Sequence, residues 1–277
     1  MHTNDNPVVV SWGGGVQSKA LALMVLNEDV RIAHYPRPAL WLFADTGHEP
    51  RKISAQVERF GNMLMDAGMA FEVVGRDEKL MDHVLSRAEA GEGGISMPPV
   101  YVDRRKRGGR MPVWRGCTRD FKANLLDRRG KAWLAERGHK QAVKWYGISY
   151  DEIQRMRTPD RAWYTNAYPL IDAKMRRTDC IGILRDAGVD PVRSACTFCP
   201  FHSNEEWRAI RDDPQDWAEV VAFERRLRAA YEARGTVAGL ESIPSLHESG
   251  LPIDQAPIDT SQEGFGWGNE CAGICGV

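Results

Sequence analysis

The sequence predicts an α/β protein built on a doubly wound, mostly parallel sheet of five strands. Short apolar runs near the amino end alternate with helix-like patterns, which is the rhythm of βαβαβ units. These runs are almost continuously apolar, as expected of strands buried on both faces of a parallel sheet. At 277 residues, the chain suits one such domain with appended segments.

The predicted strands and helices follow one another in a regular order. PVVVSW is the first strand, and a helix follows at about residues 18–27. ALWLFAD is the second strand, followed by a helix at about residues 51–67, and AFEVVG is the third strand, with a helix after it. AVKWYGIS, residues 142–149, follows a helical stretch at about residues 121–137 and is the fourth strand. AYPLI, residues 167–171, is predicted as the fifth.

Other regions depart from this rhythm. GEGGISMPPVYVDRRKRGGRMPVWRG is rich in Gly, Pro and Arg and predicts a long surface loop or hairpin. Loops of that length inside compact domains are usually functional or mobile. Two helices are expected after Cys199, at about residues 204–211 and 214–233. The predicted organisation is an α/β domain over residues 1–200 with a basic insertion at 91–116, a helical extension over 201–234, and an irregular, flexible tail over 235–277.

Charge and hydropathy narrow the functional classes. The 37 Lys and Arg residues against 38 Asp and Glu leave a formal net charge of -1, so only a local basic patch would favour nucleic acid. No stretch approaches the ~18 consecutive apolar residues of a membrane span, and the start MHTNDN is typical of neither a signal nor a transit peptide. We expect a cytoplasmic protein without membrane contact, whose six cysteines are metal ligands, catalytic thiols or buried residues rather than disulfides.

Three consecutive glycines, Gly13, Gly14 and Gly15, separate the first strand from its helix. A glycine-rich turn at a helix N-terminus presents backbone N–H groups to an anion, and phosphate is the usual ligand. The spacing matches neither GxGxxG nor GxxxxGK[ST], which disfavours a dinucleotide site and a Walker ATPase. The alternative is a tight turn in which the glycines serve packing alone.

The glycine loop resembles the SGGxxS-like pyrophosphate-binding loop of the adenine nucleotide alpha hydrolase, or N-type ATP pyrophosphatase (PP-loop), superfamily. DTGHEP after the second strand and GISYDEIQRMR after the fourth are similar to segments of its phosphoadenylylsulfate (PAPS) reductase branch. Both segments follow the carboxyl ends of strands, where ligands sit in open α/β sheets. The resemblance runs from residue 8 to about residue 200 and implies this fold and a site for ATP, or adenylylsulfate, with Mg. The implied nucleotide-binding residues are Ser11, Gly13, Gly14, Gly15, Gln17, Ser18, Asp45, Thr46, Gly47, Gly147, Arg155 and Arg157. For the two arginines the alternative is an exposed basic helix face.

The cysteines suggest a metal centre. Cys196 and Cys199 have C-x-x-C spacing, which lets two thiolates bind one metal or cluster, and Cys117 and Cys180 complete a four-thiolate candidate set. GCTRDFK, around Cys117, resembles the first cysteine segment of iron–sulfur members of the reductase branch and of relatives that thiolate DNA backbones or tRNA bases, so a [4Fe-4S] cluster is implied. A single cysteine stands at 117 where many reductases have two adjacent ones, so Cys180 completes the set or one iron is left open. Alternatives are structural zinc, a redox dithiol, and burial of Cys180 as a small core residue. His202 is predicted to be a hydrogen-bonded loop residue rather than a ligand.

The tail NECAGICGV contains Cys271 and Cys275 between glycines. E-C-x-G is similar to the carboxyl-terminal E-C-G of sulfonucleotide reductases, which implies that these are catalytic thiols. The second cysteine departs from that tail and fits a persulfide carrier with a resolving thiol, or a second metal half-site.

The segment DRRKRGGR has five cations in eight positions, with Trp114 shortly after it. It fits an electrostatic docking strip for a polyanion with an aromatic ring for stacking, and its alternative is a solvated loop. The docking residues predicted from it are Arg104, Arg105, Lys106, Arg107 and Arg110.

Two enzyme classes and one non-catalytic class remain. The first is an ATP pyrophosphatase that adenylates an acceptor on tRNA or DNA, releases pyrophosphate, and lets a cluster-bound or persulfide sulfur, supplied for example by a cysteine desulfurase, displace AMP. The second is a sulfonucleotide reductase that releases sulfite and uses a thioredoxin-like reductant. The third is a nucleotide-sensing or scaffold module. The basic insertion and the two-cysteine tail favour the first.

Overall fold

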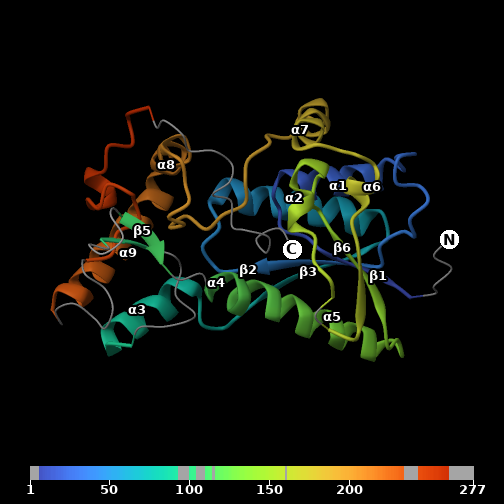
Figure 1. Ribbon diagram of the computed structural model, residues 1–277, viewed down its shortest axis with the longest axis horizontal. Helices are drawn as coiled ribbons and strands as arrows, with labels where there is room; N and C mark the ends of the chain where they lie inside the picture. Colours follow the sequence, from blue (N-terminus) through green and yellow to red (C-terminus); the bar gives the residue numbers. More distant parts are fainter. Residues whose placement is uncertain are drawn as a thin grey trace.

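The computed structural model describes residues 6–92, 100–103, 110–113, 116–159, 161–233 and 243–261. Its largest sheet is entirely parallel and has five strands in the order β3-β2-β1-β6-β7 (Figure 1). The strands are β1 (Val8–Ser11), β2 (Leu40–Asp45), β3 (Ala70–Gly75), β6 (Ala142–Tyr146) and β7 (Tyr164–Ala167). The predicted α/β class with a five-stranded parallel sheet is therefore confirmed.

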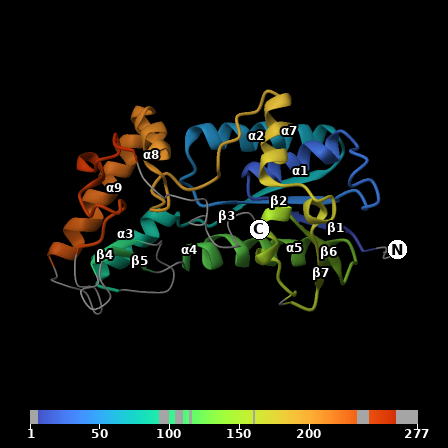
Figure 2. The same cartoon turned by 45° about the horizontal axis from the view of Figure 1, so that its top comes forward.

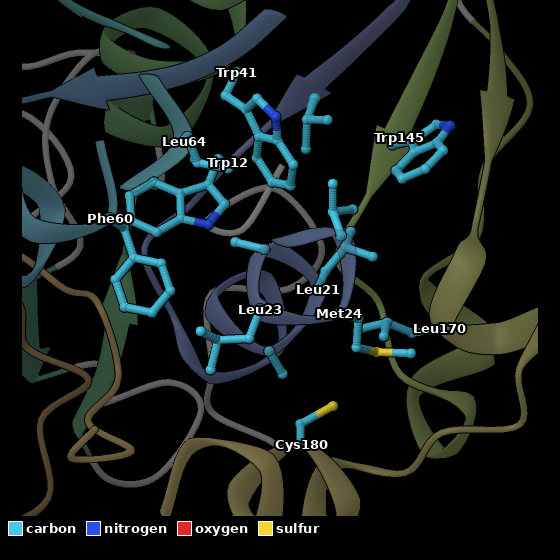
Figure 3. Close-up of a cluster of buried hydrophobic side chains, with 14 of the residues drawn as sticks. Trp12, Leu21, Leu23, Met24, Trp41, Phe60, Leu64, Trp145, Leu170 and Cys180 are labelled. Atoms are coloured by element: carbon cyan, nitrogen blue, oxygen red, sulfur yellow. The ribbon is translucent and has the colours of Figure 1, made fainter. Parts of the chain in front are cut away.

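Helices cover both faces of this sheet (Figures 1 and 2). One face carries α1 (Val16–Leu26), α2 (Arg51–Asp66) and α7 (Arg177–Asp186), and the other carries α5 (Asn124–Glu136). Successive strand residues point to opposite faces, so Val8 and Val10 pack under α1 whereas Val9 packs against α5. Figure 3 shows the core on the α1 face, where Trp12 and Trp145 lie around the helix and Met24 belongs to it.

A second group of elements lies together at one end of the molecule, on the left in Figure 1. It contains α3 (Leu80–Ala90), α8 (Asn204–Arg211), α9 (Pro214–Glu232), the 3-10 turn η3 (Ile253–Gln255) and an antiparallel hairpin of β4 (Val100–Asp103) and β5 (Arg110–Val113). Residues of α3, β4, α8, α9 and η3 share a separate hydrophobic core that includes Phe198, Trp207 and Phe223. The buried carboxylate of Glu224 accepts hydrogen bonds from the backbone N–H groups of Leu246 and Ile253, which ties the last described segment to α9.

Most predicted elements are present, with two exceptions. The predicted strand at residues 167–171 is wrong: β7 ends at Ala167, and Pro169 begins the short helix α6 (Pro169–Asp172). Proline has no N–H for a strand ladder but suits the first turn of a helix. Helix α7 was not predicted. The hairpin expected in the insertion is present, and no helix of the described residues is both long and apolar enough to cross a membrane.

Candidate functional site

The glycine loop connects β1 to α1 at the carboxyl edge of the sheet. Gly14 is buried and has a φ of +67°, and a Cβ added to it would lie 3.2 Å from the Phe43 ring. Gly15 is half-buried, has ordinary extended backbone with a φ of -83°, and has only the backbone N of Ser194 at 4.0 Å from an added Cβ. Gly14 therefore serves backbone geometry and packing. Gly15 leaves the N-terminal end of α1 open, where N–H groups favour an anion.

The loops after β1 and β6 meet at the point where the strand order reverses. The chain adds β2 and β3 on one side of β1, and β6 and β7 on the other. A Cβ on Gly147, directly after β6, would lie 3.0 Å from Cα and 3.1 Å from N of Ser18 in α1. Ser11, the last residue of β1, and Ser149, three residues after β6, are fully buried, and neither hydroxyl has a hydrogen-bond partner within the described residues. A bound ligand or water at this point would satisfy them, because buried polar groups are costly to leave unpaired.

A polar network joins the first turn of α1 to two arginines. Gln17 Nε2 donates to Glu152 Oε2 at 2.9 Å, and Arg155 Nη1 donates to the same oxygen at 2.6 Å. Arg177 Nη1 donates to Gln17 Oε1 at 3.2 Å. Sequence reasoning missed Arg177 and Glu152 as site residues. The sequence marks both positions: Arg177 is the second arginine of MRRTDC, and Glu152 is the glutamate of the E-x-x-R match.

Arg157 behaves differently from Arg155. Its side chain is exposed. Its backbone N–H donates to the Tyr168 hydroxyl at 3.0 Å, and its backbone carbonyl accepts from that hydroxyl at 2.9 Å. The structure therefore brings Arg155, but not Arg157, into the network around α1.

The Asp45-Thr46-Gly47 turn after β2 is held by its neighbours. Asp45 Oδ1 accepts from Gly47 N at 2.7 Å, while its Oδ2 lies 3.5 Å from Lys79 Nζ. The stem of Lys79 packs on Gly47, where an added Cβ would be 2.4 Å from Lys79 Cδ. Thr46 is buried, and its Oγ1 lies 3.0 Å from Cys196 Sγ. The turn is thus linked to the C-x-x-C segment, next to the glycine loop.

The Cys196 thiol lies in a buried polar cluster that sequence reasoning missed. Glu49 Oε1 is 3.9 Å from Cys196 Sγ and 3.7 Å from Lys122 Nζ, and Glu49 Oε2 accepts from Ser194 Oγ at 3.4 Å. The Glu49 side chain is only 3% exposed. Burial, followed by the nearby Glu49 carboxylate, raises the pKa of Cys196 well above its usual value, so the thiol is protonated at neutral pH. The sequence signals were available, since Glu49 stands in DTGHEP and Lys122 in GCTRDFK.

Backbone hydrogen bonds fix the C-x-x-C segment. The carbonyl of Cys196 accepts from Cys199 N at 2.9 Å and from His202 Nε2 at 2.8 Å. The prediction that His202 is a hydrogen-bonded loop residue is confirmed. Cys117 is half-buried in the single helical turn α4 (Gly116–Thr118) and packs against the second core, which also contains Cys196. The wider π-helical turn η1 (Arg119–Ala123) follows and carries Lys122.

Cys180 is not near the other three thiols. It is fully buried in α7, packed into the core around α1 (Figure 3), and burial, followed by Asp179 and Asp151, raises its pKa to about 12. Among the described residues, no group of three or more His, Cys, Asp or Glu side chains is arranged to hold a metal ion. A [4Fe-4S] cluster on Cys117, Cys180, Cys196 and Cys199 therefore does not fit this structure. The physical reason is that Cys180 faces α1 instead of the sheet edge.

Several predicted residues lie outside the described residues. These are the tail thiols and most of the basic strip: Cys271, Cys275, Arg104, Arg105, Lys106 and Arg107. Of Arg110, the structure describes only the backbone, at the start of β5.

No protein-family model matches the chain, and no curated protein does. Among solved structures, the chain is similar to the "U34-tRNA thiolase NcsA from Methanococcus maripaludis with its [4Fe-4S] cluster", at 12% identity and a TM-score of 0.39. The match covers 80% of this chain and 72% of that one. A likeness at this level leaves the function to be argued from the geometry of the chain itself.

Proposed function

We propose that the carboxyl edge of the sheet binds ATP with Mg²⁺, and that the protein is an ATP pyrophosphatase that activates an acceptor for sulfur transfer. The observation that carries this proposal is the meeting of the β1 and β6 loops at the N-terminus of α1. That junction combines open backbone N–H groups, the buried hydroxyls of Ser11 and Ser149, and the guanidinium groups of Arg155 and Arg177. Helix N-termini and arginines are the usual ligands of phosphate oxygens.

The proposed chemistry uses these groups as electrostatic supports. An acceptor oxygen attacks the α-phosphorus of ATP, and pyrophosphate leaves with the electron pair of the broken P–O bond. The N–H groups of α1 and the arginines stabilise the negative charge that develops on the phosphates. The outer sulfur of a cysteine persulfide then attacks the activated carbon of the acceptor and displaces AMP. A second thiol of the chain cleaves the resulting S–S bond, which releases the thiolated acceptor and leaves a protein disulfide that an external thiol reductant reduces.

The sulfur-handling part of the proposal uses cysteine thiols of this chain. Cys196 is the described thiol nearest to the nucleotide loops, because it is hydrogen-bonded to Thr46 directly after β2. The tail thiols Cys271 and Cys275 are proposed carriers of persulfide sulfur from an external donor such as a cysteine desulfurase. Because the four-thiolate set does not fit, no step is assigned to a metal centre. The proposed acceptor is a nucleic acid, tRNA or DNA, on the strength of the basic strip in the sequence.

Nucleotide binding and turnover test the proposal. Calorimetry with ATP should give binding that Arg177→Ala and Arg155→Ala weaken at least about tenfold, since each removes a charged partner of the phosphates. Arg157→Ala is the matched control and should bind like the native protein. Pyrophosphate release should then depend on added tRNA or DNA.

One result would replace this proposal with the sulfonucleotide reductase alternative. That result is sulfite release from adenylylsulfate that requires Cys271 and a thioredoxin-like reductant, and is independent of ATP and nucleic acid. Nucleotide binding without either reaction would favour a sensing module.

A further inference from the structure

A second candidate binding site lies at the opposite edge of the sheet. A groove of about 580 Å³ is lined by Asn6, Lys131, Lys140, Gln141, Arg161 and Trp163. Asn6 precedes β1, Gln141 precedes β6, and Trp163 precedes β7, so the groove runs along the amino ends of three strands. It is therefore separated from the glycine loop by the length of the strands, about 17 Å for five residues.

The lining of this groove is cationic. Lys131 and Lys140 are exposed and form no ion pair within the described residues. Arg161, whose side chain is 51% exposed, is the third cation of the lining. Arg161 lies 3.9 Å from Asp127, but that carboxylate is held more closely by Lys144 at 2.6 Å. Among the residues that the structure describes, no carboxylate is part of the lining. The groove therefore attracts an anion.

The aromatic wall of the groove is rigid. A Cβ on Gly130 of α5 would lie 3.1 Å from Trp163 Cη2, so the indole packs directly on the helix. Tyr164 packs edge-on against Trp163 at 4.7 Å between ring centroids, and the Trp163 carbonyl accepts from Ala142 N at 2.9 Å. A fixed aromatic side chain beside cations is the combination used to hold single-stranded nucleic acid.

The cations continue along α5. Arg128 is exposed and lies three residues before Lys131, which puts both side chains on one face of the helix. Arg128 has no ion pair within the described part of the chain. A row of cations leading into the groove fits successive phosphates of a chain better than a single small anion.

We infer that this groove and the adjoining face of α5 dock the phosphodiester backbone of a single-stranded nucleic acid segment. Lys131, Lys140 and Arg161 contact phosphates, and the amides of Asn6 and Gln141 are donors and acceptors for sugar or base edges. The inference does not depend on ATP chemistry, because none of these residues belongs to the carboxyl-edge site. It adds a contact surface for the nucleic acid that the proposed function expects.

The test is fluorescence anisotropy with a labelled oligo-U of about 15 nucleotides, measured on the full chain over a range of salt concentrations. The groove variant combines Lys131→Ala, Lys140→Ala and Arg161→Ala. The loss of three phosphate contacts should raise Kd about tenfold at moderate salt and lower the log–log salt slope by about 2. A charge-keeping variant, Lys131→Arg with Lys140→Arg, should bind like the native protein.

The matched control makes the same charge change elsewhere. It combines Arg59→Ala, Lys174→Ala and Arg185→Ala, which are exposed residues with no ion pair in the described residues. This control should keep the native Kd and slope. Equal losses in the two triple variants, an unchanged groove variant, or full displacement of the oligonucleotide by excess AMP or inorganic phosphate would overturn the inference. The groove variant should bind ATP with the native affinity. If the native protein does not bind ATP at all, the proposed function fails, but the oligonucleotide measurement still tests the groove.

Discussion

At the residue scale, Gly14 and Gly15 of the glycine loop are not equivalent. Gly14→Ala adds a Cβ at positive φ, 3.2 Å from Phe43, and we expect it to lower the free energy of unfolding by about 1–2 kcal/mol. Gly15→Ala meets only one atom, at 4.0 Å, and should change stability by less than about 0.5 kcal/mol. Urea unfolding of both variants measures this difference.

The larger change Gly15→Val then isolates ligand binding. It should leave the protein folded yet reduce ATP affinity in calorimetry, because the branched side chain stands at the open end of α1. Native ATP affinity in folded Gly15→Val protein would exclude the loop from the nucleotide site.

Lys19 in α1 gives the protein a pH-dependent stability. Its ammonium contacts Gln56 Oε1 and the Val192 carbonyl, and burial lowers its pKa to about 8. The unfolded chain keeps a value near 10.5, so it binds more protons than the native state between these pH values, and the free energy of unfolding rises with pH in that window. The native protein should gain about 2 kcal/mol relative to Lys19→Met between pH 8 and pH 10.

Urea unfolding at the two pH values measures this gain. The control is exposed Lys174→Met, whose stability should follow that of the native protein at both. A constant difference between the native protein and Lys19→Met would contradict the shifted pKa.

At the element scale, the β6 loop and α1 approach each other closely through their backbones. Gly147→Ala would push a Cβ to 3.0 Å from the backbone of Ser18, so we expect a loss of about 1–3 kcal/mol in stability together with weaker ATP binding. Gly182→Ala in α7 is the control, since no atom lies within 4 Å of its added Cβ. It should stabilise the protein by about 1 kcal/mol and leave ATP binding unchanged. Thermal unfolding with and without ATP distinguishes the two outcomes.

The elements differ in how well the sequence predicts them. β1, β2 and β6 are predicted because their apolar runs reflect burial on both faces of the sheet. β3 lies at an edge and is only partly buried, but its apolar residues still mark it as a strand. β7 has the mixed sequence YTNA at the sheet edge, so its pattern does not stand out, and the stronger apolar string beyond it belongs to α6. Helix α7 was missed because few of its residues are buried, namely Arg177, Cys180 and Leu184.

The sequence predicts only those residues of the candidate site that follow the ends of predicted strands. The glycine loop, Gly147 and Arg155 follow strand ends, so parallel topology brings them together. The contacts of Cys196 with Thr46 and Glu49, and the separation of Cys180 from Cys117, depend on how the loops pack in three dimensions. Residue spacing contains no information on that packing.

At the scale of the whole molecule, the thiols belong to two different cores. Cys180 is part of the core under α1, whereas Cys117 and Cys196 belong with the second core. Cys180→Ala should therefore cost about 1 kcal/mol in stability and leave the iron and zinc content per chain unchanged after anaerobic purification. A lower metal content in Cys180→Ala than in the native protein would restore Cys180 as a ligand. The iron and zinc content of Cys196→Ala, measured in parallel, shows whether a thiol at the sheet edge binds metal.

The central position of β1 has a consequence for the newly made chain. One neighbour of β1 is β2, which is close to it in the sequence. The other neighbour is β6, which is far along the chain, so that Val8 pairs with Val143. Such distant parallel pairing is slow to form, and the amino-terminal part of a chain leaves the ribosome first. The glycine loop is thus synthesised long before Gly147, Arg155 and Arg177, which complete its surroundings. A partly synthesised chain lacks these residues around the glycine loop. If the loop binds ATP as proposed, we expect ATP affinity to arise only after β6 has docked, and unfinished chains to consume no ATP.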